Sequence, residues 1–368
     1  MNISRHRSVI LTTLFILLAS FTYCKQKENG FAKNTSSPEI NDTALLFAGK
    51  DLPKESKLYR YSQSAFYKSY RQQMASSWNS MQKPNLQKIT DWWQKHRPSR
   101  PSGSVLYPFS GPDIMNALTF YPDCDSIIMF GLEPPGVIPN PAGMSADQIT
   151  RGLNGLRGSL GDILHMNFFK TEGMAAEMSN KSFNSIGGII MYFLATNDYT
   201  IVDARKIAID AKSTVVPGTD SDDRINWQNP PKSRIPGVEI SFRKGSGKTK
   251  TVRYYMLNVI DHALETSSPN FLPYLRKEGP YATIIKSASY LMHNDNVKFT
   301  KIRAAILEST NYLVQDDSGI PLRYFKPDRW KLAFHGYYDG PIGLFANRMQ
   351  RDLEGDGRKV HRQASLQL

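Results

Sequence analysis

The amino-acid sequence predicts an α/β fold built on a mixed, partly parallel sheet with flanking helices. The chain can form a sizeable core, since its 368 residues are 40% hydrophobic and 11% aromatic. Within residues 104–133, apolar runs at 105–107 and 126–130 enclose a segment whose apolar residues recur at helical spacing over 114–121. Apolar runs this short, bounded by Gly and Pro, favour buried strands over helices. The stretch therefore predicts a strand, turn, helix and strand, the unit of a parallel sheet.

The N-terminus has the pattern of a secretory leader over residues 1–23. The positively charged start Arg-His-Arg at 5–7 precedes an apolar stretch at 9–18, and small residues follow at 19–20. This apolar stretch is shorter than the roughly twenty residues that a membrane-spanning helix needs. We therefore expect the chain to be exported, with residues 1–23 acting as a signal peptide.

The residues around Cys24, Leu-Ala-Ser-Phe-Thr-Tyr-Cys-Lys over 18–25, resemble the lipobox of bacterial lipoproteins. In that family the cysteine thiol receives a diacylglyceryl group, and the lipid alone holds the protein to a membrane surface. Tyr23 stands where the family places a small residue. The resemblance implies a lipid on Cys24, a membrane as partner and an extracytoplasmic location in the cell envelope. Ordinary secretion after cleavage and an uncleaved anchor are the alternatives.

The second cysteine bears on the same question. With Cys24 acylated, Cys124 has no partner within the chain, so the fold must hold without a disulfide. The alternative is a bridge between the two cysteines in a protein without the lipid. Asp123 and Asp125 flank Cys124, and their carboxylates raise the pKa of a neighbouring thiol. Cys124 is therefore a poor candidate for a nucleophile.

The first third of the mature chain is predicted to contain a tether and two helices. Residues 24–55 are mostly polar and are expected to tether an α/β body over 56–353, with an apolar patch at 44–47 docking on it. Over 58–81 bulky apolar residues recur at intervals close to four, which predicts a helix with one large apolar face. This face is either core packing, which we favour, or an aromatic platform for a ligand. A second helix is expected over 86–93.

The stretch after the central unit is predicted to alternate between helix and sheet. Ser145 and Gln148 form a capping-box pattern ahead of a helix. Segments 187–195 and 199–208 are interpreted as two strands. The polar, turn-rich stretch 210–236 is expected to be an excursion or a domain boundary.

The last third begins with a predicted hairpin. Segments 238–243 and 249–257 alternate in polarity and are joined through Gly-Ser-Gly, as in two antiparallel strands. The remaining expected elements are helices at 270–275 and 300–313, a late strand at 319–325 and a loose basic tail at 354–368.

The central unit resembles the first half of a Rossmann-type methyltransferase. The turn after its first strand contains Ser110, Gly111 and Asp113, and Glu133 follows its second strand, where that family places the carboxylate that binds a ribose. The resemblance implies a Rossmann-like unit at 104–133 and a weak cofactor site at Ser110, Gly111 and Glu133. The turn has one glycine instead of a pair, and Pro112 lacks the N–H that a ligand would want. Because nucleotide cofactors are not generally available outside the inner membrane, we expect no cofactor.

Five titratable residues at the ends of predicted elements are candidates for catalysis. Loops at strand ends are where α/β proteins place their sites, and histidines with carboxylates supply general acids and bases. The alternative is ordinary turn chemistry, in which Asp side chains cap their own backbone. A hydrolase-like enzyme would require Asp113 or Glu133 to share a pocket with a histidine. The five candidates are Asp113, Glu133, His293, Asp316 and His335.

The formal net charge of +13 favours acidic envelope surfaces or ligands as partners. Basic residues are not interleaved with aromatic residues as in RNA-binding sheets, and no metal-ligand motif is present, so we expect neither nucleic acid nor a metal. The motifs at 107–113 and 316–321 resemble a group of bacterial exported proteins without an assigned activity. The sequence thus predicts an exported, lipid-anchored envelope protein with a binding or structural role. A hydrolase-like enzyme and a methyltransferase-like protein are the alternatives.

Overall fold

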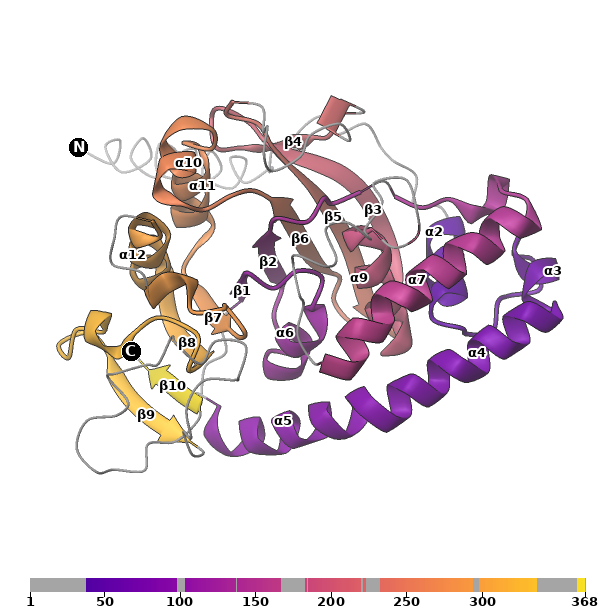
Figure 1. Ribbon diagram of the computed structural model, residues 1–368, viewed down its shortest axis with the longest axis horizontal. Coiled ribbons are helices and arrows are strands. Elements are labelled where there is room, and N and C mark those ends of the chain that lie inside the picture. Colours follow the sequence, from indigo (N-terminus) through magenta and orange to yellow (C-terminus); the bar gives the residue numbers. More distant parts are fainter. Residues whose placement is uncertain are drawn as a thin grey trace, which may run out of the picture. The chain divides into compact units, whose positions relative to one another are not determined.

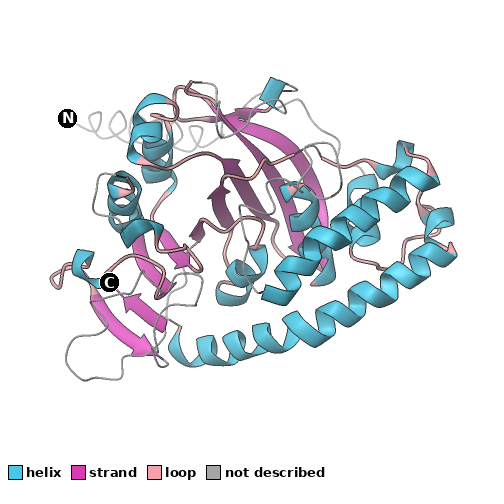
Figure 2. Ribbon diagram, viewed as in Figure 1, coloured by secondary structure: helices cyan, strands magenta, loops and turns pink. Residues whose placement is uncertain are grey.

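A ten-stranded mixed sheet with helices on both faces forms the body of the protein (Figures 1 and 2). This confirms the expected α/β class with a mixed, partly parallel sheet. The computed structural model describes residues 38–97, 103–136, 138–166, 183, 185–219, 221–222, 232–293, 298–335 and 363–367. The predicted leader and Cys24 lie outside the described residues. In order across the sheet the strands are β4 (Val215–Pro217), β3 (Tyr199–Ile209), β5 (Ile235–Lys244), β6 (Lys250–Met256), β2 (Ser126–Gly131), β1 (Ser104–Pro108), β7 (Tyr281–Ile285), β8 (Thr310–Asp316), β10 (Gln363–Gln367) and β9 (Lys331–His335).

The unit predicted over 104–133 is present as β1, α6 (Ile114–Phe120) and β2. Strands β1 and β2 run parallel, with Leu106 opposite Ile128. Asp113 caps α6, because its side chain accepts a hydrogen bond from the backbone N–H of Asn116. The sequence pattern therefore predicted this unit correctly.

Five neighbouring strands, β6, β2, β1, β7 and β8, run parallel. Counted along the chain, they stand in the order third, second, first, fourth and fifth, as in the doubly wound Rossmann fold. The direction in which the chain adds strands reverses between β1 and β7. In sheets of this type ligands bind outside the carboxyl ends of the strands at such a switch point.

Antiparallel strands extend the parallel core on both sides. The predicted hairpin forms β5 and β6, and the predicted strand 199–208 forms β3, which pairs with β5. On the other side β10 lies antiparallel between β8 and β9. The tail predicted to be loose therefore contains a strand over Gln363–Gln367, because this segment pairs with β8 on one side and with β9 on the other.

Side chains of the parallel strands alternate between two apolar layers. Val105 and Tyr107 belong to one buried cluster and Leu106 to the other. Figure 1 shows the helices of each layer on its own side of the strands. The first layer holds α2 (Pro38–Phe47), α4 (Ala65–Ser77), α5 (Lys83–His96), α6, α7 (Ala146–Met166) and α9 (Ile186–Thr196), and the second α10 (Asp261–Thr266), α11 (Phe271–Glu278) and α12 (Thr300–Ser309).

The apolar stripe over 58–81 belongs to a helical arm of α3 (Tyr59–Ser62), α4 and a π-helical turn, η1 (Trp78–Gln82), which continues into α5. Tyr67, Tyr70 and Met74 are buried, so most of the stripe is core packing.

The segment 187–195 was predicted to be a strand and is the helix α9. Its residues from Ile186 to Ala195 are all buried, so no polar face marks the helical period. Ser185 begins the helix by accepting a hydrogen bond from the N–H of Gly188. An apolar run of this length is ambiguous by periodicity alone, and burial on every side produced the wrong prediction.

Two further expectations are corrected by the described residues. The helix predicted over 300–313 ends at Ser309, because Thr310 already pairs with Tyr281 in the sheet. The late strand expected at 319–325 is a 3₁₀ turn, η5 (Leu322–Tyr324), since its backbone turns back on itself with Tyr324 donating to the carbonyl of Pro321.

The domain boundaries also differ from those expected. The predicted tether over 24–55 is shorter than predicted, because α2 lies within it and buries Ala44, Leu46 and Phe47 in the first layer. The described residues belong to one compact unit that extends across the boundary predicted near 210–236. Within the described part of the chain, we find no helix with the length and apolar character that crossing a membrane requires.

Candidate functional site

A cavity of about 240 Å³ lies at the carboxyl ends of the parallel strands. Its lining comes from the segments that follow β1, β2, β6 and β7, which places it at the switch point of the sheet. We call this cavity the switch-point pocket. It is lined by Phe109, Phe130, Gly131, Leu132, Glu133, Leu257, Asn258, Val259, Ile260, Ser287, Ala288, Ser289, Leu291 and Phe299.

Glu133 is the one ionisable side chain among the described residues that line the pocket. Its side chain is buried, with 2% of the residue exposed, at the end of β2. Tyr254 Oη lies 3.0 Å from both Glu133 Oε2 and the Glu133 carbonyl oxygen, and donates to them. A carboxylate can accept about four hydrogen bonds. Glu133 therefore keeps most of its accepting capacity for a ligand in the pocket.

The Tyr254 hydroxyl stays a donor because burial, and then the neighbouring Glu133 charge, raises the pKa of Tyr254 well above its ordinary value. Gly131 makes room for the pair. A Cβ at this position would lie 2.5 Å from Glu133 Oε2 and 2.8 Å from Tyr254 Oη. The glycine that ends β2 therefore permits the buried pair of Glu133 and Tyr254.

Two loops around the pocket hold residues in the left-handed backbone region. Phe109, after β1, has a φ of 58°, and Ser287 and Ser289, after β7, have φ values of 54° and 55°. This region is uncommon for residues other than glycine, and such strain gathers at ligand sites. The ring of Phe109 packs between Phe130, at 5.7 Å between ring centroids, and Phe299, at 6.4 Å. The strained loops thus present a firm aromatic wall and two serines.

Asp316, one of the five candidates, positions one of these loops. Its carboxylate accepts from the backbone N–H groups of Ser287, at 2.7 Å, and Ser318, at 3.0 Å. Ser318 Oγ in turn accepts from the N–H of Ala288 at 2.7 Å. Asp316 therefore acts on the pocket through the backbone of the loop after β7, and is not itself among the lining residues.

Asp113 is occupied by helix capping. It accepts from the Asn116 side chain at 2.6 Å and from Tyr107 Oη at 3.0 Å, and Lys286 Nζ lies 3.9 Å away. Burial raises the pKa of Asp113, while Lys286 and the two donors oppose that rise. Asp113 is not among the residues that line the pocket.

The two candidate histidines lie on other elements. His293 belongs to η4 (Leu291–His293), with its ring 5.0 Å from that of Tyr290. His335 ends β9, where its ring lies 4.2 Å from that of His96 on α5. Neither histidine lines the pocket. Of the five candidates, the structure places Glu133 alone in this cavity.

The weak cofactor site expected at Ser110, Gly111 and Glu133 is not brought together in the pocket. Ser110 is buried, and its hydroxyl donates to the carbonyl of Gly111 at 3.0 Å. Asp113 places a carboxyl group at the start of α6, where it accepts from the N–H of Asn116 and where a phosphate would otherwise lie. The residues present therefore fit a ligand without phosphate better than a dinucleotide. The described residues also contain no group of three or more His, Cys, Asp or Glu side chains placed to hold a metal ion.

Cys124 is buried between α6 and β2 and lies away from the pocket. Burial raises the pKa of its thiol to about 11; the nearby Lys250 opposes this, and Asp125 and Asp123 add to it. The expected direction of the shift is thus present, with burial and not the carboxylates as its main cause.

The sequence offered no sign of Tyr254 or of the strained serines. Tyr254 is one apolar residue among several on an alternating strand, and left-handed serines have no sequence signature. Phe109 and Asn258 could have been found by taking every residue that follows a predicted parallel strand.

A second, larger cavity of about 540 Å³ lies on the opposite side, near the amino ends of the parallel strands. We assign the candidate site to the smaller one because it combines the switch point with a buried carboxyl group. Comparison with protein-family models, with curated proteins and with solved structures finds no match to this chain. The functional assignment therefore rests on the fold and on the residues of the pocket.

Proposed function

We propose that the chain is an exported envelope protein, anchored by a lipid on Cys24, whose body binds a small ligand with two adjacent hydroxyl groups in the switch-point pocket. The observation that carries the binding proposal is Glu133, a buried carboxyl group with a single described donor at the end of β2. The leader and the lipobox-like run at 18–25 support the anchor.

A pair of hydroxyl groups suits this site because each oxygen of a carboxylate can accept from one of them. In Rossmann-type sheets an acidic residue near this position binds the hydroxyl groups of a ribose. The rest of the lining is mostly apolar, and the described lining residues include no Lys, Arg or His. The favoured ligand is therefore small and uncharged.

Two kinds of ligand carry this chemistry, a nucleoside and a free sugar. The strand order and the place of Glu133 favour the nucleoside, as in the methyltransferase-type alternative. Export favours the sugar, because nucleotide cofactors are scarce outside the inner membrane. Both ligands would be recognised through the same pair of oxygens.

The hydrolase-like alternative receives less support. Asp113 and Asp316 spend their hydrogen bonds on caps and turns, and His293 and His335 lie outside the pocket. A general acid or base must reach the reacting group directly or through one water. Among the five candidates, Glu133 alone is placed to touch a ligand in this cavity.

Binding is tested by calorimetric titration of the mature protein with adenosine and with ribose, each paired with its 2-deoxy form. We expect Glu133→Gln to weaken binding by about 10- to 100-fold, the value of a hydrogen bond to a charged group. Glu265→Gln, on the exposed end of α10, is the matched control and should bind normally. Equal affinity for the hydroxyl and deoxy forms, or full binding by Glu133→Gln, would contradict the proposal.

The anchor is tested by intact mass measurement of protein extracted from membranes. We expect loss of residues 1–23 and addition of lipid mass at Cys24, and Cys24→Ser should appear in the soluble fraction. An unmodified Cys24 at the mature N-terminus would support ordinary secretion, and an intact leader would support the uncleaved anchor; either result overturns the lipid.

A further inference from the structure

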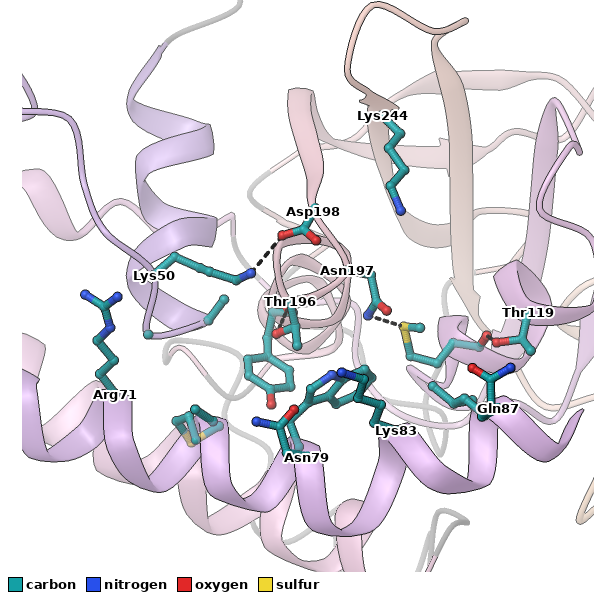
Figure 3. Close-up of a pocket in the computed structure, with 18 of the residues that line it drawn as sticks. Lys50, Arg71, Asn79, Lys83, Gln87, Thr119, Thr196, Asn197, Asp198 and Lys244 are labelled. Carbon is teal, nitrogen blue, oxygen red and sulfur yellow. Dashed lines mark hydrogen bonds and ion pairs between the residues drawn. The ribbon is translucent and has the colours of Figure 1, made fainter. Parts of the chain in front are cut away.

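The larger cavity lies beside the helical arm, near the amino ends of the parallel strands (Figure 3). Its walls come from α4, η1 and α5 on one side, and from the ends of α6, α9 and β5 on the other. Its volume is about 540 Å³, within the usual range for ligand sites. We call it the arm cleft, and it shares no lining residue with the switch-point pocket.

The arm cleft carries a surplus of positive charge. Two of its four basic side chains are paired with carboxylates, Lys50 with Asp198 at 2.8 Å and Arg71 with Asp51. Lys83 and Lys244 have no carboxylate partner among the described residues. Figure 3 shows Lys244 extending into the cleft from the end of β5 and Lys83 on the opposite wall.

Lys83 and Lys244 are both exposed, and Lys244 also lies 5.4 Å from the ring centroid of Tyr199. Two ammonium groups on facing walls attract an anion that enters between them.

The cleft also presents hydrogen-bond acceptors. Thr90, Thr119 and Thr196 each donate their hydroxyl proton to the carbonyl four residues earlier, at 2.8 to 2.9 Å. A hydroxyl has one proton and two lone pairs, so these groups can accept but no longer donate. Asn197 spends its amide N–H on the carbonyl of Phe193 and on Met115 Sδ, which leaves its carbonyl oxygen as an acceptor. The lining therefore favours a ligand that brings hydroxyl protons.

Trp78 supplies a half-buried aromatic wall beside these polar groups. It belongs to the apolar stripe of the arm, whose earlier members Tyr67, Tyr70 and Met74 are core residues. The apolar face of a sugar ring could bury its C–H groups against such a wall.

From these three features we propose that the arm cleft binds an anionic sugar, one that carries a phosphate or carboxylate together with several hydroxyl groups. The anion meets Lys83 and Lys244, the hydroxyl groups donate to the threonines and to Asn197, and the ring packs on Trp78. A neutral sugar would leave the two lysines unmatched, and an inorganic anion would leave the acceptors unmatched. The site is independent of the ligand proposed for the switch-point pocket.

The proposal is tested by calorimetric titration with glucose 6-phosphate, with glucose and inorganic phosphate as separate probes of its two halves. We expect saturable binding of glucose 6-phosphate that weakens as salt is added, and at least tenfold weaker binding of each half. Lys83→Gln and Lys244→Gln should each lower the affinity for glucose 6-phosphate two- to fivefold, as expected for exposed charge pairs.

Lys277→Gln, an exposed lysine on α11 outside the cleft, is the matched control and should bind like the original chain. Glu133→Gln should also bind glucose 6-phosphate normally, which separates this site from the pocket. No saturable binding of glucose 6-phosphate, equal affinity for phosphate alone, or full affinity in the lysine double variant would each overturn the proposal. Thermal unfolding of the lysine variants checks that they remain folded.

Discussion

The two cavities lie at opposite ends of the same parallel strands, and their walls differ in composition. The switch-point pocket has about 240 Å³, mostly apolar walls of buried and half-buried residues, and one buried carboxyl group. The arm cleft has about 540 Å³ and walls of mostly exposed or half-buried side chains, with two lysines that have no carboxylate partner among the described residues. The position of the pocket follows from strand order, whereas the cleft exists because a helical arm stands beside the sheet. Recognition in the pocket therefore depends on one residue, and recognition in the cleft on many.

Helix α6 connects the two sites. Its capping residue Asp113 follows the strained loop that lines the pocket, and Thr119 near its other end lines the cleft. If the two sites are independent, a substitution in one of them should leave ligand binding in the other unchanged.

The largest expected effect comes from the wall of the pocket. Phe130 is fully buried, and its ring lies 5.7 Å from that of Phe109 and 5.1 Å from that of Phe271. We expect Phe130→Ala to lower the free energy of unfolding by about 3–5 kcal/mol, because it leaves a cavity in the core. Lys83→Ala, in the wall of the cleft, should change it by less than about 0.5 kcal/mol. Urea unfolding of both variants gives the comparison, and similar losses would refute the difference between the walls.

A smaller loss is expected when the buried carboxyl group loses its donor. Tyr254→Phe should lower the free energy of unfolding by about 1–3 kcal/mol and weaken ligand binding in the pocket, because Glu133 is left buried without a described partner. Tyr255→Phe is the control, since it removes a buried hydroxyl that is shared with Tyr274 on the other face of the sheet. The control should lose stability but keep the ligand. Equal binding losses would mean that Tyr254 has no special role at the site.

A smaller effect, which depends on pH, is expected from Asp113 on the free energy of unfolding. Because burial raises its pKa above the ordinary 3.8, the folded chain holds this proton more tightly than the unfolded chain. The free energy of unfolding that Asp113 contributes should therefore fall as pH rises from about 3.8 through the raised value. Asp113→Asn removes this fall, so its stability relative to the original chain should increase across that interval. Urea unfolding at several values between about pH 3 and pH 7 measures it, and a constant difference would contradict the assignment.

Local patterns were sufficient for the central unit and for the carboxyl group that marks the pocket. The short apolar runs around α6 predicted β1 and β2, and Glu133, singled out through the Rossmann-type resemblance, follows β2 and lines the pocket. The β5–β6 hairpin was predicted by alternation and a Gly-rich turn. In each case the signal lies within about thirty residues, so tertiary structure was not needed to interpret it.

The predictions failed where the deciding contact is distant in sequence. Helix α9 is buried on all sides, and Thr310 leaves a helical pattern because Tyr281 pairs with it. The same holds for the sites. Tyr254 and Glu133 are 121 residues apart in the sequence. Lys83 and Lys244 face the same cleft only because the helical arm lies beside the end of β5. No periodicity carries information of that range.

The smallest expected effect tests the acceptors of the cleft. Thr196→Val keeps the shape of the side chain but removes an oxygen that can accept from a ligand hydroxyl, so the affinity for glucose 6-phosphate should fall two- to tenfold. Thr266→Val is a close control, because Thr266 makes the same hydrogen bond to the carbonyl four residues earlier and lies at the exposed end of α10. Both variants lose one local hydrogen bond, so similar small changes in stability are expected. A lower affinity for glucose 6-phosphate in Thr196→Val, but not in Thr266→Val, would show that the Thr196 hydroxyl contacts the ligand. Equal affinities in the two variants would contradict a role of Thr196 in binding. The affinity of the switch-point pocket for its proposed ligand should be the same in both variants, because neither threonine lines that pocket.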